Sequence, residues 1–109
     1  MIDELCHFGV LELARLYRRG EISPVEVVNA HLQRCERLNP VLNAFLLILR
    51  DSAIQTSRAM EALFQAGIDL GPLQGVPISV KDIIRLQGTV TTAASRVLLQ
   101  EPPDQRDAG

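Results

Sequence analysis

The sequence predicts an α/β fold: N-terminal helices and the first strands of a mixed sheet covered by helices, incomplete in this chain. Three segments repeat apolar residues with the period of a helix. Two short apolar runs do not alternate with polar residues, which is typical of strands covered on both faces. The predicted order is helix, helix, strand, helix, strand and loop. At 109 residues, the chain forms at most one domain.

The composition is that of a globular protein, with 47% hydrophobic and 22% charged residues. A net charge of −2 argues against a surface for nucleic acid or an anionic membrane. The two cysteines and two histidines, Cys6, Cys35, His7 and His31, do not have the spacing of a metal site, so we expect structural or solvated roles. No signal peptide or membrane span is visible, and a reduced, cytoplasmic location is expected.

The first predicted helix covers residues 9–19 and ends at Gly20, which can adopt the left-handed conformation that closes a helix. Arg18 and Arg19 suit the negative C-terminal end of its dipole. Its apolar face consists of Val10, Leu13, Ala14 and Tyr17.

The second predicted helix has the clearest start signal in the chain. Ser23 is the expected N-cap, Pro24 occupies the first helical position, and Glu26 completes a capping box. We expect this helix to end near Leu38, because Pro40 disfavours a helical conformation at the preceding residue. The predicted buried face is Val25, Val28, Leu32 and Cys35.

A first strand is predicted over residues 43–49, where the apolar run has no polar alternation. A third helix is expected over about residues 52–66, with Gly67 just past its end. Its buried stripe would consist of Ala53, Ser57, Met60 and Phe64. Residues 95–99 resemble the opening turns of a further helix, with Ser95 as its cap.

The second predicted strand, Val76–Lys81, ends in the only lysine of the chain. Pro77 cannot donate to a strand ladder, so it belongs at the strand start or at an edge. Burial at the end of an apolar strand would favour the neutral amine of Lys81, which could act as a base. A solvated strand end is the structural alternative.

Residues near Lys81 in the sequence are candidates for supporting roles. We expect Asp82 to accept backbone N–H bonds in the turn that follows rather than to pair with Lys81, because adjacent strand residues point to opposite faces. Ser79 shares the face of Lys81, but no strand-turn-helix elbow surrounds it as a nucleophile requires. Thr91–Ser95 could line a site near Lys81 or could be a polar loop that closes a helix.

This region resembles the amidase signature family. The resemblance rests on Gly71-Pro72-Leu73, Gly75-Val76-Pro77, Lys81-Asp82, Gly88, Thr91-Thr92 and Ser95. Further similarities at residues 20–26, 39–45 and 107–108 extend it over almost the whole chain. It implies that residues 1–109 are the N-terminal part of a single amidase domain, and that the chain stops before the Gly/Ser-rich catalytic loop.

The resemblance implies a serine amidase that hydrolyses carbon–nitrogen amide bonds by acyl transfer. Lys81 would be the base of a Ser–cis-Ser–Lys triad whose two serines lie outside this chain, so the 109 residues alone are expected to be inactive. The implied mechanism uses a small-molecule amide substrate and no metal or organic cofactor.

Two alternatives remain open. The glutamine-hydrolysing component of a tRNA-dependent amidotransferase has the same N-terminal pattern and would act with partner subunits. A more distant alternative is a helix-turn-helix DNA-binding module formed by the first two helices, but the acidic balance argues against direct nucleic-acid binding. A homo-oligomer is compatible with the sequence, and membrane association is not expected.

Overall fold

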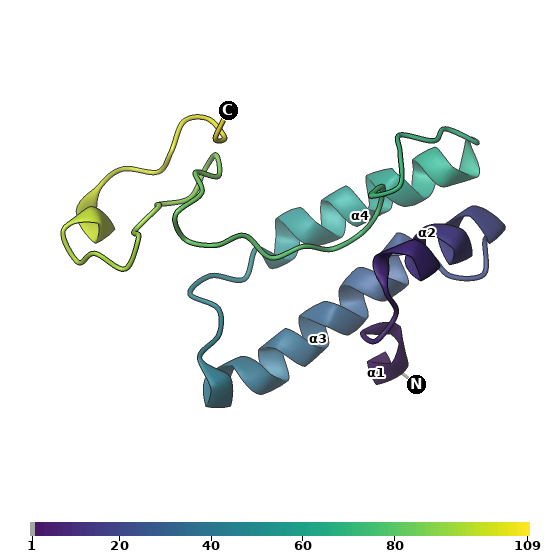
Figure 1. Cartoon of the computed structure of the whole chain (residues 1–109), viewed down its shortest axis with the longest axis horizontal. Helices are drawn as coiled ribbons and strands as arrows, with labels where there is room; N and C mark the ends of the chain where they lie inside the picture. The colour runs from purple at the N-terminus through teal and green to yellow at the C-terminus, as the bar shows by residue number, and fades with distance from the viewer. Residues whose placement is uncertain (1) are drawn as a thin grey trace. The chain divides into compact units, whose positions relative to one another are not determined.

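The computed structural model describes residues 2–109. The described residues form four α-helices and one short 3₁₀ helix (Figure 1): α1 (Ile2–Leu5), α2 (Val10–Arg19), α3 (Pro24–Leu42), α4 (Arg50–Gln65) and η1 (Leu98–Gln100). The chain divides into two compact units, which we describe separately. The helical unit comprises the residues up to Pro77, and the C-terminal unit comprises Ile78–Gly109.

The predicted helix starts and stops in the helical unit are largely confirmed. The Glu26 N–H donates to Ser23 Oγ at 3.2 Å and the Ser23 N–H donates to Glu26 Oε2 at 2.8 Å, which completes the capping box of α3. Gly20 ends α2 with φ 68°. Gly67, with φ 74°, follows α4 and donates its N–H to the Phe64 carbonyl at 3.0 Å. These ends are fixed by local chemistry that can be recognised in sequence.

The predicted end of α3 near Leu38 is wrong, because the helix continues through Pro40 to Leu42. A proline in the last turn removes only one backbone donor. The helix then closes at Asn43, which adopts the left-handed conformation with φ 50° and donates its N–H to the Asn39 carbonyl at 2.7 Å. Asparagine tolerates this conformation better than most residues, which allows the longer helix.

The two predicted strands do not form in the described residues, so this part of the α/β prediction is not confirmed. A strand needs a neighbour for its backbone hydrogen bonds. In the segment 43–49, the Asn39 side chain takes that place: it accepts from the Phe45 N–H at 2.8 Å and donates to the Phe45 carbonyl at 3.0 Å. Residues 76–80 have no regular secondary structure.

The core of the helical unit lies where α2, α3 and α4 converge. Leu13, Tyr17 and Val27 are its buried centre, and Val27 is completely inaccessible to solvent. The Tyr17 and Phe64 rings pack with centroids 5.5 Å apart. The partly buried hydrophobic residues around this centre are Phe8, Ile22, Phe64 and Val76. Figure 1 shows α3 and α4 running side by side in opposite directions.

The predicted apolar faces agree only partly with this core. Leu13, Ala14 and Tyr17 of α2 are buried as expected, but Val10 is 43% exposed. In α3, Val28 and Leu32 are buried as predicted, while the prediction missed Val27 and Ala30. In α4, Ser57 is buried, and its hydroxyl donates to the Ile54 carbonyl at 2.7 Å.

The C-terminal unit is mostly irregular backbone. The Gly88 N–H donates to the Asp104 carbonyl and the Asp104 N–H donates to the Thr89 carbonyl, both at 2.8 Å. The helix predicted from Ser95 is wrong: η1 is a single turn that begins at Leu98, and it has no side-chain cap. Pro102 and Pro103 follow soon after, which limits any longer helix.

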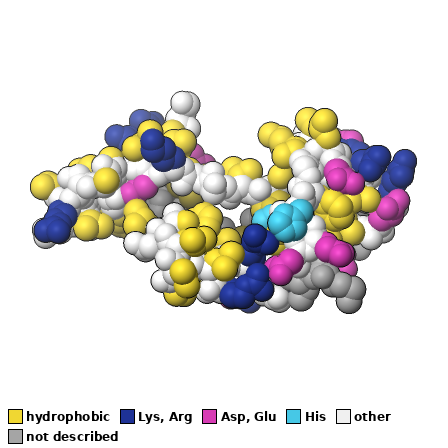
Figure 2. Space-filling model, turned by 60° about the horizontal axis from the view of Figure 1, so that its bottom comes forward, with side chains coloured by type: hydrophobic (Ala, Val, Ile, Leu, Met, Phe, Trp, Pro, Cys, Tyr) yellow, Lys and Arg dark blue, Asp and Glu magenta, His cyan; other side chains and the backbone are white. Residues whose placement is uncertain are grey.

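Many large apolar side chains are open to solvent. Figure 2 shows hydrophobic side chains spread over the visible surface. In the helical unit, Val41 is 82% exposed and Leu46 is 77% exposed, and in the C-terminal unit Ile78 is 78% exposed. No helix in the described residues is long and apolar enough to cross a membrane.

Candidate functional site

Lys81 lies near the start of the C-terminal unit, and its side chain is exposed. Its carbonyl accepts the N–H groups of Ile83 at 2.8 Å and Ile84 at 3.0 Å, so the chain turns directly after it. The predicted strand that ends at Lys81 is therefore not confirmed, and Lys81 is exposed within the residues described. No strand among residues 2–109 lies beside this segment, and the neighbouring Val80 and Ile83 are exposed as well.

Asp82 is bound on two sides by the loop that contains Thr92. Its carboxylate accepts the Thr92 N–H at 2.9 Å and also the Thr92 hydroxyl. Its carbonyl accepts the Ala93 N–H at 2.8 Å. We call these three hydrogen bonds the Thr92 clasp. The hydroxyl bond and then the backbone bond from Thr92 lower the pKa of Asp82 below its ordinary value.

The prediction that Asp82 accepts a backbone N–H is confirmed, but its predicted donor is wrong: the N–H belongs to Thr92, ten residues further along the chain, and not to the turn that follows Asp82. Thr92 is 7% exposed and is the only buried residue among 78–109, all of which the structure describes. The neighbouring Thr91 hydroxyl donates to the carboxylate of Asp104. The loop thus joins the segment next to Lys81 to the last residues of the chain.

A tight turn follows the clasp. The Ser95 N–H donates to the Thr92 carbonyl at 2.7 Å, and the two central residues, Ala93 and Ala94, have φ values of 47° and 61°. Two successive left-handed residues are the pattern of a type I′ turn, which favours glycine or asparagine over alanine. Ser79 is exposed and Ser95 is half-buried. No hydrogen bond joins either hydroxyl to Lys81 within the described part of the chain.

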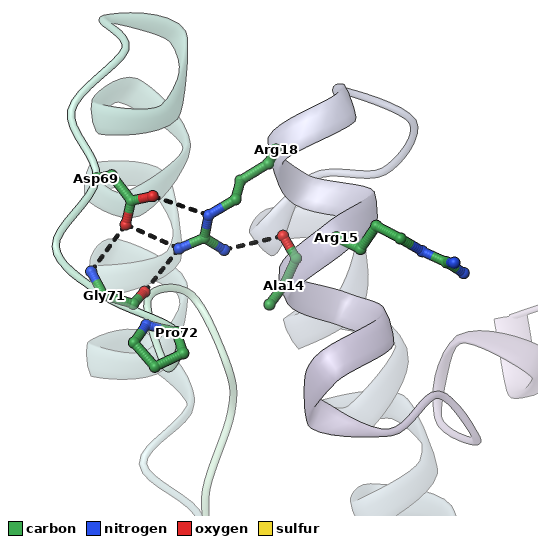
Figure 3. Close-up of a pocket in the computed structure, with 6 residues that line it drawn as sticks. All are labelled: Ala14, Arg15, Arg18, Asp69, Gly71 and Pro72. Carbon is green, nitrogen blue, oxygen red and sulfur yellow. Dashed lines mark hydrogen bonds and ion pairs between the residues drawn. The ribbon is translucent and has the colours of Figure 1, made fainter.

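The segment that leads towards Lys81 is anchored in the helical unit by Arg18 of α2. Its guanidinium binds the Asp69 carboxylate through Nε at 2.9 Å and Nη2 at 2.8 Å (Figure 3). It also donates to the carbonyls of Ala14 at 2.9 Å and Gly71 at 2.8 Å. The Arg18 bond and the Gly71 N–H lower the pKa of Asp69 to about 2, and Asp69 in turn raises the pKa of Arg18. We call this group the Arg18 network.

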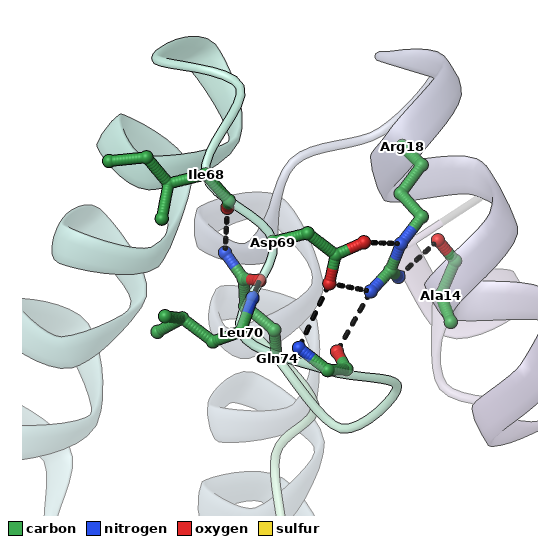
Figure 4. A network of polar contacts seen from close by, with 7 residues as sticks. Ala14, Arg18, Ile68, Asp69, Leu70 and Gln74 are labelled. Carbon is green, nitrogen blue, oxygen red and sulfur yellow. Dashed lines mark hydrogen bonds and ion pairs between the residues drawn. The ribbon is translucent and has the colours of Figure 1, made fainter.

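Gln74 and Tyr17 extend this anchoring to Gly75. The Gln74 side chain accepts the Leu70 N–H at 2.6 Å and donates to the Ile68 carbonyl at 3.1 Å (Figure 4). The Tyr17 hydroxyl donates to the Gly75 carbonyl at 3.1 Å, and burial raises the pKa of this phenol. Residues 69–75 are therefore held on α2 by Arg18 and Tyr17, and the Gln74 side chain ties the loop to itself.

A pocket opens beside the Arg18 network (Figure 3), lined by Ala14, Arg15, Arg18, Asp69, Gly71 and Pro72. Arg18 already makes four hydrogen bonds there. The geometry therefore favours a structural role for this arginine over ligand binding. Within residues 2–109, no group of three or more histidine, cysteine or acidic side chains is arranged to hold a metal ion.

Comparison with known proteins identifies the family. The family model described as Amidase matches residues 26–109, which include Lys81, Asp82 and Thr92. The chain belongs to the amidase family. Among curated relatives, it is 41% identical over 102 residues to the A-type subunit of glutamyl-tRNA(Gln) amidotransferase from Salinispora tropica, covering 94% of this chain and 21% of that protein. The protein of the same name from Thermobifida fusca is 39% identical, with coverages of 99% and 23%.

A solved structure shares the fold of this amidase segment. It is described as an unexpected vestigial protein complex that reveals the evolutionary origins of an s-triazine catabolic enzyme, in an inhibitor-bound form. The match has a TM-score of 0.88 and 26% identity, and covers 93% of this chain and 22% of that one. The chain thus spans about a fifth of the length of these relatives.

Sequence reasoning identified Lys81, Asp82 and the Thr91–Ser95 loop but missed the Arg18 network. Arg18 was expected only to complement the dipole of α2, and Asp69 was given no role. The two residues lie 51 positions apart, so no local pattern links them. The bond between Thr92 and Asp82 also had no direct signal, although both residues belong to the motif that carries the family resemblance.

Proposed function

We propose that residues 1–109 are the N-terminal part of a single amidase domain, and that the complete protein is a serine amidase using a Ser–cis-Ser–Lys triad with Lys81 as its base. The observation that carries this proposal is the Lys81-Asp82 pair, which lies inside the family-matched region and is joined to the Thr92 loop by the clasp. The two serines would come from the rest of the domain.

The chemistry is acyl transfer. The nucleophilic serine oxygen attacks the amide carbon, while the bridging serine takes its proton and passes its own proton to the neutral amine of Lys81. The amine product leaves with a proton returned along this path, and water then releases the acid from the acyl-enzyme. Lys81 is exposed in residues 2–109, so this mechanism requires later parts of the domain to complete and cover the site.

The test uses the complete open reading frame that contains these 109 residues. Hydrolysis of simple carboxamides is measured for the wild type, Lys81→Ala and Lys81→Arg. Both variants are expected to lose turnover by about 10²–10⁴-fold, the usual contribution of a general acid–base group. Arg85→Lys, which changes an exposed cation in the same unit, is the matched control. Lys81→Arg with most of the wild-type activity would contradict the proposal, because arginine cannot deprotonate.

A second function is favoured by the names of the curated relatives, which are amidotransferase subunits. In that case, glutamine would be the amide, and the ammonia would pass to a partner subunit. Glutamine hydrolysis that increases when candidate partner subunits and charged tRNA are added would favour the amidotransferase. Hydrolysis of several carboxamides without any partner would favour a free-standing amidase.

The 109 residues alone are expected to be inactive on simple amides and on glutamine. A Ser–Ser–Lys mechanism needs all three groups within hydrogen-bond reach, and this chain supplies only the lysine. Purified residues 1–109 are assayed beside Lys81→Ala. Turnover by the wild-type segment that disappears in Lys81→Ala would contradict this expectation and point to Ser79 or Ser95 as a nucleophile.

A further inference from the structure

We infer that Thr92 is a positioning residue for Lys81 and acts through Asp82. This inference rests on the proposed function of Lys81 as the base. The structure connects the two residues through the Thr92 clasp, in which Thr92 supplies two of the three hydrogen bonds and Ala93 the third.

The clasp fixes the backbone on the C-terminal side of Lys81. Asp82 is held both by its carboxylate and by its carbonyl, so its backbone and its side chain are both restrained against the Thr92 loop. The carbonyl of Lys81 is held separately by the N–H groups of Ile83 and Ile84. Together these bonds define the direction in which the Cα–Cβ bond of Lys81 leaves the chain.

Thr92 is suited to this role because it is the most buried residue of the clasp. It is 7% exposed, whereas Lys81 is exposed and Asp82 is half-buried. The following turn, closed by the Ser95 N–H on the Thr92 carbonyl, fixes the Thr92 backbone from the other side. A buried threonine can supply both a backbone and a hydroxyl donor to one carboxylate, and hydrogen bonds to a charged group are stronger than neutral ones.

A base must lie within hydrogen-bond reach of the proton that it takes. The side chain of Lys81 is long and flexible, so its accuracy depends on a firmly held backbone. A misplacement of about 1 Å can reduce turnover by about 100-fold. We therefore expect loss of the Thr92 hydroxyl to reduce kcat by about 100-fold and to leave KM nearly unchanged, because this buried hydroxyl is bonded to Asp82 and would act on the position of the base.

The experiment compares Thr92→Val with Thr92→Ser in the complete protein. Valine has the shape of threonine but no hydroxyl, while serine keeps the hydroxyl and should restore most of kcat. Thr89→Val is the matched control, because the Thr89 hydroxyl donates at 2.8 Å to the Leu86 carbonyl in the same unit, away from Asp82. If Thr92→Val does not fold, Asp82→Ala removes the hydroxyl bond together with the Thr92 N–H bond to the carboxylate, at a less buried position.

The outcomes separate this inference from the function on which it rests. The positioning role would be overturned if Thr92→Val and Asp82→Ala kept their turnover while Lys81→Arg lost it. The assignment of Lys81 as the base would then still stand. A loss in Thr92→Val that serine does not restore, or that Thr89→Val reproduces, would also overturn the positioning role. Lys81→Arg that keeps turnover would contradict the proposed function itself.

Discussion

The helical unit buries Leu13, Tyr17 and Val27 between three helices, whereas Thr92 is the only buried residue in the fully described range 78–109. The first unit is organised by apolar packing, with polar anchors added around it. The second unit is organised by hydrogen bonds to Asp82 and Asp104, and its large apolar side chains Ile78 and Val97 are 78% and 77% exposed.

The helical unit therefore holds the apolar core, while the C-terminal unit holds the proposed catalytic residue Lys81. Helices satisfy their backbone hydrogen bonds internally, so α2, α3 and α4 can form a core from one continuous segment. The segment with Lys81 has no such local solution, and its exposed apolar residues need surfaces supplied from elsewhere. We expect those surfaces to come from the remainder of the proposed amidase domain.

The largest effect that would sharpen this comparison is expected for Gly75→Ala. Gly75 has φ 80°, and an added Cβ would lie 2.9 Å from Pro24 Cγ and 3.3 Å from Phe64 Cε2. Strained backbone and an overfilled core should reduce the free energy of unfolding by about 2–4 kcal/mol. Chemical denaturation followed by circular dichroism measures this change.

Gly67→Ala is the matched control for the strain alone. Gly67 also has a positive φ, 74°, but an added Cβ meets no atom within 4 Å. It should cost only about 1–2 kcal/mol, which is the cost of the left-handed conformation alone. Equal losses for the two variants would show that Gly75 is not packed against the helices.

A smaller loss is expected for Ser23→Ala, which removes the N-cap of α3. The Glu26 N–H would lose its partner, and the free energy of unfolding should fall by about 1 kcal/mol. Ser52→Ala, at an exposed site inside α4, is the control and should change stability little. A large loss of amide hydrolysis by a folded Ser23→Ala protein would mean that Ser23 has a role beyond capping.

In the C-terminal unit, a single change should strengthen the turn after the clasp. Ala94→Gly removes the cost of a left-handed alanine, but it also increases the freedom of the unfolded chain. The net gain should be about 0.5 kcal/mol, seen as slower hydrogen exchange of the Ser95 amide. Ala108→Gly, at an exposed position outside the left-handed region, should give no gain. Faster exchange in Ala94→Gly would contradict the turn geometry.

The smallest effect concerns the exposed Arg18–Asp69 pair. The pKa of Asp69 is about 2 in the folded chain, below its ordinary value of 3.8. The pair therefore stabilises the fold fully above pH 3.8, and its contribution disappears as the pH falls towards 2. In Asp69→Asn, the free energy of unfolding should depend less on pH in this range. Asp51→Asn, which removes another exposed carboxylate, is the control. An identical pH dependence for the wild type and Asp69→Asn would show that the pair contributes nothing.

Local signals account for what could be predicted from the sequence. The start of α3 is set by a signal only four residues long, which contains Ser23, Pro24 and Glu26. The end of α2 is set by the left-handed conformation of Gly20. The segment 43–49 was predicted as a strand because its residues are apolar. A strand, however, also requires a partner, and Asn39 satisfies the Phe45 backbone instead.

The candidate site shows the same limit. Lys81 and Asp82 could be singled out because the motif places them together, and the carboxylate was correctly expected to accept a backbone N–H. The identity of that donor, Thr92, depends on how the loop folds back. Burial of Lys81 could not be judged from its apolar neighbours, because burial depends on what covers them.

Hydrogen exchange of the purified 109-residue chain tests most directly whether its two units are held by different forces. Amides of α2 and α3 around Tyr17 and Val27 should be the most protected, because they open only when the core is lost. The amides of Gly88, Thr92 and Asp104 should exchange much faster, because polar bonds at an uncovered surface open locally. Equal protection at Val27 and Thr92 would contradict this account and would mean that residues 78–109 share the core of the helices.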